Sequence, residues 1–300
     1  MRNLANECRS LYWFGALLPI LTFTACCHLG RPPLKDRAEA IITLQRNEFE
    51  SQAKIAKALR RISADELKPD RLRTYDTRTL EVLFEALHLA DGMMDREDLV
   101  PAMEAIFVET FQNRSFIFDM PKSLQDSYIQ HRMWAKARDN QMKNHVGDAP
   151  LPQFVENEIP AGPAVYDVSE DGRTLTLRPV SLSSGSLIVS VLNPNCHFCQ
   201  QAEKAISEDH QLMQAFSNSL NVYPAIWSLD LDDITKANKE GKFRYVILYK
   251  ASQWPGMEFD STPYFYFFKD GKIVYKLDGW GPGALGKLKE GLKMIAERRG

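Results

Sequence analysis

Two cysteines, Cys196 and Cys199, lie three positions apart where an apolar run gives way to a helical pattern. The run at 187–192 predicts a buried strand, and residues 200–206 predict a helix. A helix N-terminus carries about half a positive charge, which favours a thiolate over a thiol at the first cysteine. The second cysteine follows about one helical turn later, close enough for a disulfide to the first. The pattern therefore predicts a reactive dithiol site.

Composition limits the chemistry that other parts of the chain could perform. The 300 residues include five cysteines but a single CxxC pair, so neither a disulfide scaffold nor a four-cysteine zinc site is expected. Hydrophobic residues make up 44% and charged residues 25%, which is typical of folded domains. The net charge of −2 gives no reason to expect nucleic acid as a partner. The length allows one large domain or two ordinary ones.

Residues 1–26 are typical of an export signal. Arg2 and Arg9 form a basic region ahead of an apolar stretch at 11–23, which is short for a bilayer span. The stretch leads into Cys26, in a context that resembles a bacterial lipobox, where the cysteine becomes lipidated. Lipidation, plain secretion and an uncleaved anchor all place the bulk of the chain outside the cytoplasm, where disulfides persist. We expect a lipid-anchored protein on the periplasmic side of a bacterial cell envelope.

Residues 36–146 are predicted to form an all-α domain. Helical patterns cover 36–62 and 77–87, resume near residue 95 and cover 124–141. Two roles are open for this domain. It could be a bundle that packs on its neighbour and spaces it from the membrane, or a surface that binds a partner or a substrate.

A proline- and glycine-rich stretch at 147–163 is expected to be a linker, which places a second domain at 164–300. This second domain is predicted to be α/β. It opens with a hairpin around Asp171-Gly172. After the cysteine pair and its helix, the patterns predict strands and helices in alternation, namely strands at 222–229, 245–249, 264–268 and 272–277, and helices at 232–242 and 285–295.

The order of strand, cysteine pair, helix, strand, helix, Thr-Pro, hairpin and closing helix resembles the thioredoxin-like superfamily. The resemblance covers roughly residues 164–299, and two motifs carry it, Cys196-His197-Phe198-Cys199 and Thr262-Pro263. It implies a mixed central sheet flanked by helices, preceded here by the all-α domain. It also implies that Pro263 follows a cis peptide bond and lies against the cysteine pair, where the neighbouring backbone binds substrate. A proline at this position cannot donate to the strand ladder, and a cis bond would explain its presence.

The resemblance implies a role for each residue of the CxxC motif. Cys196 would be the nucleophile and Cys199 the resolving thiol. A protonated His197 would favour the thiolate, although this residue could equally be a spacer. Phe198 would present an apolar face to the substrate. An aromatic residue before the second cysteine, together with threonine before the proline, is similar to the periplasmic disulfide isomerases and reductases.

Two departures from thioredoxin itself narrow the expected activity. Thioredoxin has a buried aspartate six residues before its first cysteine, and Ser190 occupies that position here. The missing carboxyl removes one proton acceptor for the resolving thiol. Asn195 replaces the tryptophan that precedes the first cysteine, and His-Phe replaces Gly-Pro between the cysteines. These departures favour a specialised envelope site over a general reductant.

Three functions are therefore open. The first is a cell-envelope thiol-disulfide oxidoreductase that acts on protein or peptide thiols and disulfides with a redox partner protein and no cofactor. The second is a binding or chaperone-like module with a static disulfide, in which Trp254, Trp280 and Phe198 form a groove. The third is a metallochaperone-like protein that uses Cys196, His197 and Cys199 as copper ligands. The direction of exchange stays open.

Overall fold

The computed structural model describes residues 31–46, 52–112, 119–147, 150–183, 185–224 and 229–296. The predicted export signal and Cys26 lie outside these residues. From Pro33 onward the chain belongs to one compact unit. Across the described ranges, no helix is both long and apolar enough to cross a membrane.

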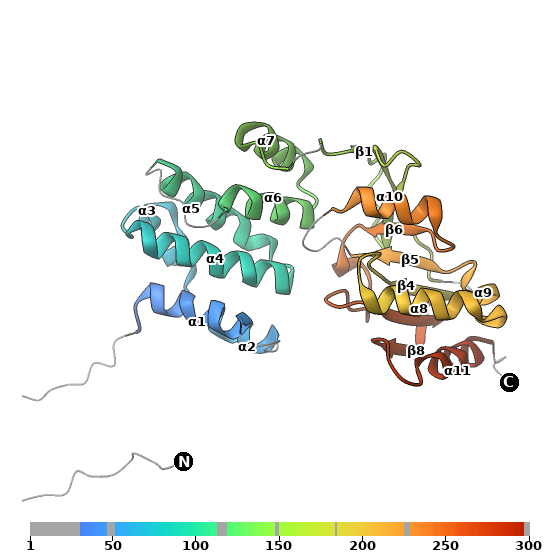
Figure 1. Cartoon of the computed structure of the whole chain (residues 1–300). Helices are drawn as coiled ribbons and strands as arrows, with labels where there is room; N and C mark the ends of the chain where they lie inside the picture. Colours follow the sequence, from blue (N-terminus) through green and yellow to red (C-terminus); the bar gives the residue numbers. More distant parts are fainter. Residues whose placement is uncertain are drawn as a thin grey trace, which may run out of the picture. The chain divides into compact units, whose positions relative to one another are not determined.

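The first half of the described chain is helical, as the sequence predicts (Figure 1). Its central element is α4, which contacts α1, α2, α5 and α6. The side chains of Leu80, Phe84 and Leu87 on α4 are buried, and Asp76 caps the helix by accepting a hydrogen bond from the Thr79 N–H. The helices are α1 (Leu34–Arg46), α2 (Gln52–Leu59), α3 (Pro69–Leu72), α4 (Thr77–Met94), α5 (Val100–Gln112), α6 (Met120–Gln130) and α7 (Trp134–Asn144).

The single helix predicted at 124–141 is wrong, because α6 and α7 are separate helices joined at Arg132. This residue has a left-handed backbone with a φ of 61°. Its guanidinium donates to the carbonyl oxygens of Tyr249 at 2.7 Å and of Leu248, at the end of a strand in the second half. A contact with residues more than a hundred positions away is invisible to a periodicity argument, and it favours the break in the helix.

The second half contains a mixed eight-stranded sheet in the order β1-β3-β2-β6-β5-β4-β7-β8. Strands β4, β5 and β6 are parallel, and β7 is antiparallel to both β4 and β8. Both predicted hairpins are present, and the predicted linker contributes the short strand β1 to the sheet edge. The strands are β1 (Gln153–Val155), β2 (Ala164–Val168), β3 (Thr174–Pro179), β4 (Ser186–Val191), β5 (Leu220–Tyr223), β6 (Tyr245–Leu248), β7 (Tyr264–Lys269) and β8 (Lys272–Asp278).

The four helices of this half are α8 (His197–Glu208), α9 (His210–Phe216), α10 (Leu231–Glu240) and α11 (Ala284–Ala296). Their buried side chains share one apolar cluster with Phe265 and Phe267 of β7. The alternate residues Tyr264 and Tyr266 belong to a second cluster on the other face, as the twofold period of a strand requires. β7 is therefore buried on both faces.

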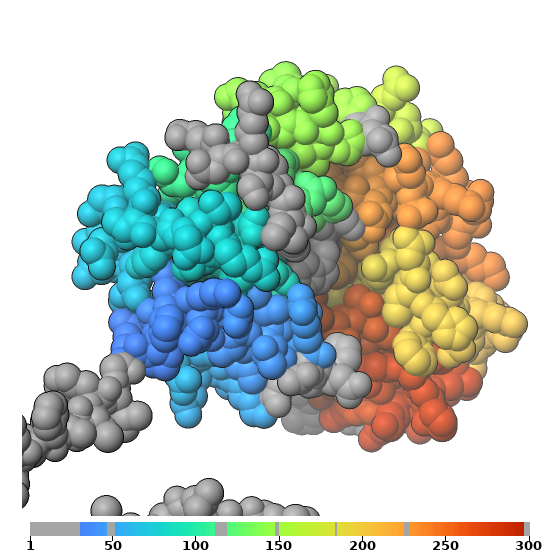
Figure 2. Space-filling view, turned by 60° about the vertical axis from the view of Figure 1, so that its left-hand side comes forward, coloured from blue at the N-terminus to red at the C-terminus, as the bar shows by residue number. Residues whose placement is uncertain are grey.

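The second apolar cluster is covered by the segment between β6 and β7. Trp254 and Phe259 of this segment are buried in that cluster, with ring centroids 6.1 Å apart. The predicted surface groove that included Trp254 is therefore wrong, since only 2% of this residue is exposed. In Figure 2 the side chains of the helical half, blue to green, adjoin those of the sheet half, yellow to red, in line with the hydrogen bonds from Arg132 to Leu248 and Tyr249.

Candidate functional site

The cysteine pair lies where β4 ends and α8 begins. Cys196 is the N-cap residue of α8, and its N–H donates to the Asn193 carbonyl oxygen at 3.0 Å. The Asn193 side chain accepts in turn from the Asn195 N–H at 2.8 Å, so a tight asparagine turn connects the strand to the helix. The Asn195 side chain donates to Asp233 on α10 at 2.6 Å. Local hydrogen bonds therefore hold the first cysteine at the helix N-terminus.

The structure brings the cysteine pair and the Thr-Pro motif together. The Sγ of Cys196 lies 3.7 Å from the carbonyl oxygen of Thr262, and the Thr262–Pro263 peptide bond is cis. Both cysteines are free thiols in this structure. Cys196 is partly exposed, whereas Cys199, in the first turn of α8, is fully buried. One thiol can therefore meet a substrate, and the other can meet only its neighbour.

The two thiols differ in acidity because their surroundings differ. Burial opposes ionisation of Cys196, but hydrogen bonds from the Thr262 side chain, the Cys199 thiol and the backbone of Cys199 and Phe198 outweigh it and lower its pKa. Burial raises the pKa of Cys199 to about 12, although the Asn193 N–H lies 3.5 Å from its sulfur. At neutral pH the pair therefore has one activated thiol and one protonated thiol.

The two residues between the cysteines face solvent. Phe198 is 53% exposed, so its ring is open to solvent next to the cysteine pair. The Nε2 atom of His197 lies 2.8 Å from the Gln201 amide nitrogen, one turn along the helix. Within the part of the chain that the structure describes, no three His, Cys, Asp or Glu side chains form a group that could hold a metal ion. The copper-ligand set predicted from Cys196, His197 and Cys199 therefore has no support in the geometry.

Ser190 is fully buried in β4, and its Oγ has no hydrogen-bond partner. The position that is aspartate in thioredoxin is therefore uncharged and unpaired here. A different acidic pair lies nearby and was missed by the sequence argument. The Tyr245 hydroxyl donates to the carboxylate of Glu203 on α8.

Burial raises the pKa of Tyr245, with further increases from the charges of Glu203, Cys199 and Cys196, so the phenol lies within electrostatic reach of the dithiol. Burial also raises the pKa of Glu203. The sequence did contain one indication that Glu203 lies near the dithiol. Glu203 follows Cys199 by four residues, and residues with this spacing share a helix face.

Comparison with known proteins finds only distant similarity, to structures described as thioredoxin-like. No protein-family model and no curated protein matches it. The solution structure of an uncharacterized thioredoxin-like protein from Porphyromonas gingivalis is 16% identical, with a TM-score of 0.33 over 49% of this chain and 97% of that chain. The crystal structure of a thioredoxin-like protein from Bacteroides caccae is 15% identical, with a TM-score of 0.32 over 90% of this chain and 89% of that one.

Proposed function

We propose that this protein is a thioredoxin-like thiol-disulfide oxidoreductase of the bacterial cell envelope. The observation that carries the proposal is the asymmetry of the dithiol. Cys196 is accessible, lies at a helix N-terminus and has a lowered pKa, whereas Cys199 is buried and has a raised pKa. A structural disulfide needs no such asymmetry, but a nucleophile and a resolving thiol do.

The topology supports the class. Strand β4, the cysteine pair, α8, β5, the Thr262-Pro263 turn, the β7–β8 hairpin and α11 follow in the order that the family resemblance implies. The export signal predicted at 1–26 supports an envelope location, with Cys26 as the lipid-anchored residue. We assign the disulfides of exported proteins or peptides as the substrates.

The proposed exchange proceeds in two balanced steps. The Cys196 thiolate attacks one sulfur of a substrate disulfide, forms a mixed disulfide and releases the other substrate sulfur as a thiolate. Cys199 then loses its proton to water or to that leaving thiolate and attacks the Cys196 sulfur, which releases the second substrate thiolate. The substrate gains two electrons, and the protein is left with a Cys196–Cys199 disulfide. A partner protein dithiol returns the pair to the reduced state, and the same steps in reverse would oxidise a substrate.

A redox titration tests this proposal. The protein is equilibrated in glutathione buffers, and the fraction with a Cys196–Cys199 disulfide is measured by alkylation and mass spectrometry. We expect a reversible midpoint above about −300 mV, in the range of exchange-active pairs. A midpoint below about −300 mV would show a static structural disulfide and favour the binding-module alternative. The Cys199→Ala variant should accumulate mixed disulfides with its substrates through Cys196, whereas the Cys196→Ala variant should not.

A further inference from the structure

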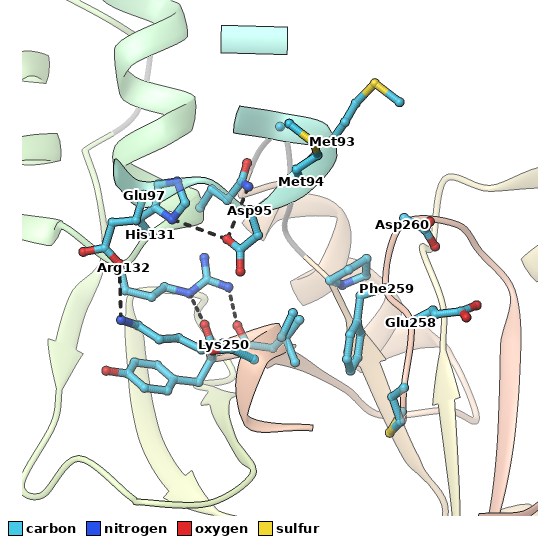
Figure 3. Close-up of a pocket in the computed structure, with 18 of the residues that line it drawn as sticks. Met93, Met94, Asp95, Glu97, His131, Arg132, Lys250, Glu258, Phe259 and Asp260 are labelled. Atoms are coloured by element: carbon cyan, nitrogen blue, oxygen red, sulfur yellow. Dashed lines mark hydrogen bonds and ion pairs between the residues drawn. The ribbon is translucent and has the colours of Figure 1, made fainter. Parts of the chain in front are cut away.

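A cavity of about 480 Å³ lies where the end of α4 and the α6–α7 connection face the segment between β6 and β7 (Figure 3). One wall contains Met93, Met94 and Asp95, and the opposite wall contains Phe259 and Asp260. This volume lies within the range of about 300–1,000 Å³ that is typical of ligand pockets. The helical half therefore contributes to a pocket that the sheet half alone would lack.

One wall of the pocket is close in sequence to the dithiol site. Asp260 lies two residues before Thr262, whose carbonyl oxygen is 3.7 Å from the Cys196 sulfur. Two residues span at most about 7 Å, and the bend at 260–262 makes the separation shorter. Pro224, which directly follows β5, also lines the pocket, and β5 ends at the same sheet edge as β4. A polypeptide joined to Cys196 can therefore place a nearby side chain in the pocket.

Two carboxylates, Asp95 and Asp260, lie on opposite walls of the pocket and are open to solvent. The Oδ1 atom of Asp95 lies 3.4 Å from the Nδ1 atom of His131, whose Nε2 atom is held by Asp91 at 2.6 Å. Asp260 accepts hydrogen bonds from the Tyr264 hydroxyl at 3.2 Å and from the Gln52 side-chain amide at 3.4 Å. Within the described ranges, no lysine or arginine forms an ion pair with either aspartate.

The cations that line the pocket are already engaged. The Arg132 guanidinium donates to backbone carbonyl oxygens, including that of Tyr249 at 2.7 Å. The Lys250 ammonium lies 3.8 Å from Glu97, and the remaining lining carboxylate, Glu258, pairs with Lys276 at 2.5 Å. Lys250 and Lys276 thus pair with Glu97 and Glu258. Asp95 has His131 and the charge of Arg132 nearby, whereas Asp260 accepts, among the described residues, only from neutral donors.

We infer that this pocket binds a lysine or arginine side chain of the substrate, close in sequence to the reacting cysteine. The inference rests on the proposed function. The charged head would lie between Asp95 and Asp260, and the apolar stem would pack on Met93, Met94 and Phe259, as long basic side chains do. The span between Asp260 and Thr262 places the basic residue two to four positions from the substrate cysteine. The substrates are therefore disulfides flanked by positive charge.

Matched peptides test the inference. Three peptides carry one cysteine as a mixed disulfide with glutathione and differ only three positions away, where they have Lys, Gln or Glu. The second-order rate constant for reduction by the reduced full-length protein is measured at low and high salt. We expect the Lys peptide to react about fivefold faster than the Gln peptide, and the Glu peptide to react more slowly than both. The preference should shrink in 1 M salt, where charges are screened within about 3 Å.

Two double variants locate the effect. Asp95→Asn with Asp260→Asn removes both charges and keeps the side-chain shapes, and Asn tolerates the left-handed backbone at position 95. Glu208→Gln with Glu240→Gln makes the same change in net charge at exposed positions outside the pocket. We expect the first variant to lose the Lys preference and the second to keep it. The second variant should reduce the uncharged 2-hydroxyethyl disulfide at the wild-type rate, and circular dichroism with urea denaturation checks that the first variant is folded.

The outcomes separate the pocket from the proposed function. Equal rates for the three peptides would overturn the pocket inference while the oxidoreductase function stands. A Lys preference that survives in the Asp95→Asn, Asp260→Asn variant would also overturn it. If the wild type reduces neither the peptides nor 2-hydroxyethyl disulfide, the proposed function itself fails.

Discussion

Selective alkylation tests the asymmetry of the dithiol most directly. The pKa of Cys196 lies below its ordinary value of 9.0, and that of Cys199 is raised to about 12. At pH 7, more than about 1% of Cys196 is therefore thiolate, against about 0.001% of Cys199, a ratio of at least about a thousandfold. The more basic Cys199 thiolate is intrinsically more nucleophilic. With a Brønsted coefficient near 0.45, this reduces the advantage of Cys196 by about twentyfold. Ionisation alone thus favours Cys196 by about fiftyfold, and the full burial of Cys199 adds to this.

The assay uses the reduced protein and limiting iodoacetamide, with fragment-ion mass spectrometry to assign the alkylated cysteine. We expect alkylation at pH 7 to be at least about fiftyfold faster at Cys196 than at Cys199. Because reactivity follows the thiolate, the Cys196 rate should rise with pH and become half-maximal below pH 9. In concentrated urea the two rates should become equal, since the tertiary contacts are lost. Rates within a factor of five in the folded protein, or a Cys196 midpoint at or above pH 9, would refute the reasoning.

Two further predictions concern stability. Ala at Gly291 would bring its Cβ within 2.6 Å of the Phe267 ring, whereas Ala at Gly286 of the same helix meets nothing within 4 Å. We expect Gly291→Ala to lower the free energy of unfolding by about 1–3 kcal/mol and Gly286→Ala to raise it by up to about 1 kcal/mol, as measured by urea denaturation. The Glu66 carboxylate accepts hydrogen bonds from the buried Arg37, and this contact lowers the pKa of Glu66 to about 2. Glu66→Gln removes the charge from this contact and should lower the free energy of unfolding by about 2 kcal/mol at pH 7. Because the pKa of Glu66 is lowered on folding, its carboxylate stabilises the folded protein above the unfolded pKa of 4.5. The difference in stability between wild type and Glu66→Gln should therefore shrink as pH falls from 4.5 to about 2. A difference that stays constant over that range would contradict the assignment.

Burial makes the Cys199 thiol difficult to deprotonate. In the proposed exchange, Cys199 must lose a proton to resolve a mixed disulfide, yet Ser190 beneath the site offers no charge and no hydrogen bond. The Glu203–Tyr245 pair is the acidic group that the structure places within electrostatic reach of both thiols. Its hydrogen bond links α8 to the start of β6, so the helix that presents the cysteines is tied to the sheet at the level of Ser190.

Much of the architecture could be predicted from local patterns. Short apolar runs indicated the strands at β4 and β6, an apolar run followed by a tight turn indicated the β7–β8 hairpin, and the spacing of Leu80, Phe84 and Leu87 indicated α4. The CxxC pair at the start of a helix could be placed because strand and helix periods, turn residues and helix N-termini act over a few residues. The sequence alone therefore determined the helical first half, the mixed α/β second half and the position of the dithiol.

Contacts between distant segments decided the rest. The break between α6 and α7 is stabilised by hydrogen bonds from Arg132 to the end of β6, and Trp254 is buried because its segment covers a sheet face. The difference in acidity between Cys196 and Cys199 arises from burial and hydrogen bonds that exist only after folding. The pocket between Asp95 and Asp260 joins residues far apart in the chain, so no local pattern signals it. Residue types supplied the chemistry, and tertiary packing decided which groups meet, because burial, charge pairing and cavity shape depend on distance in space.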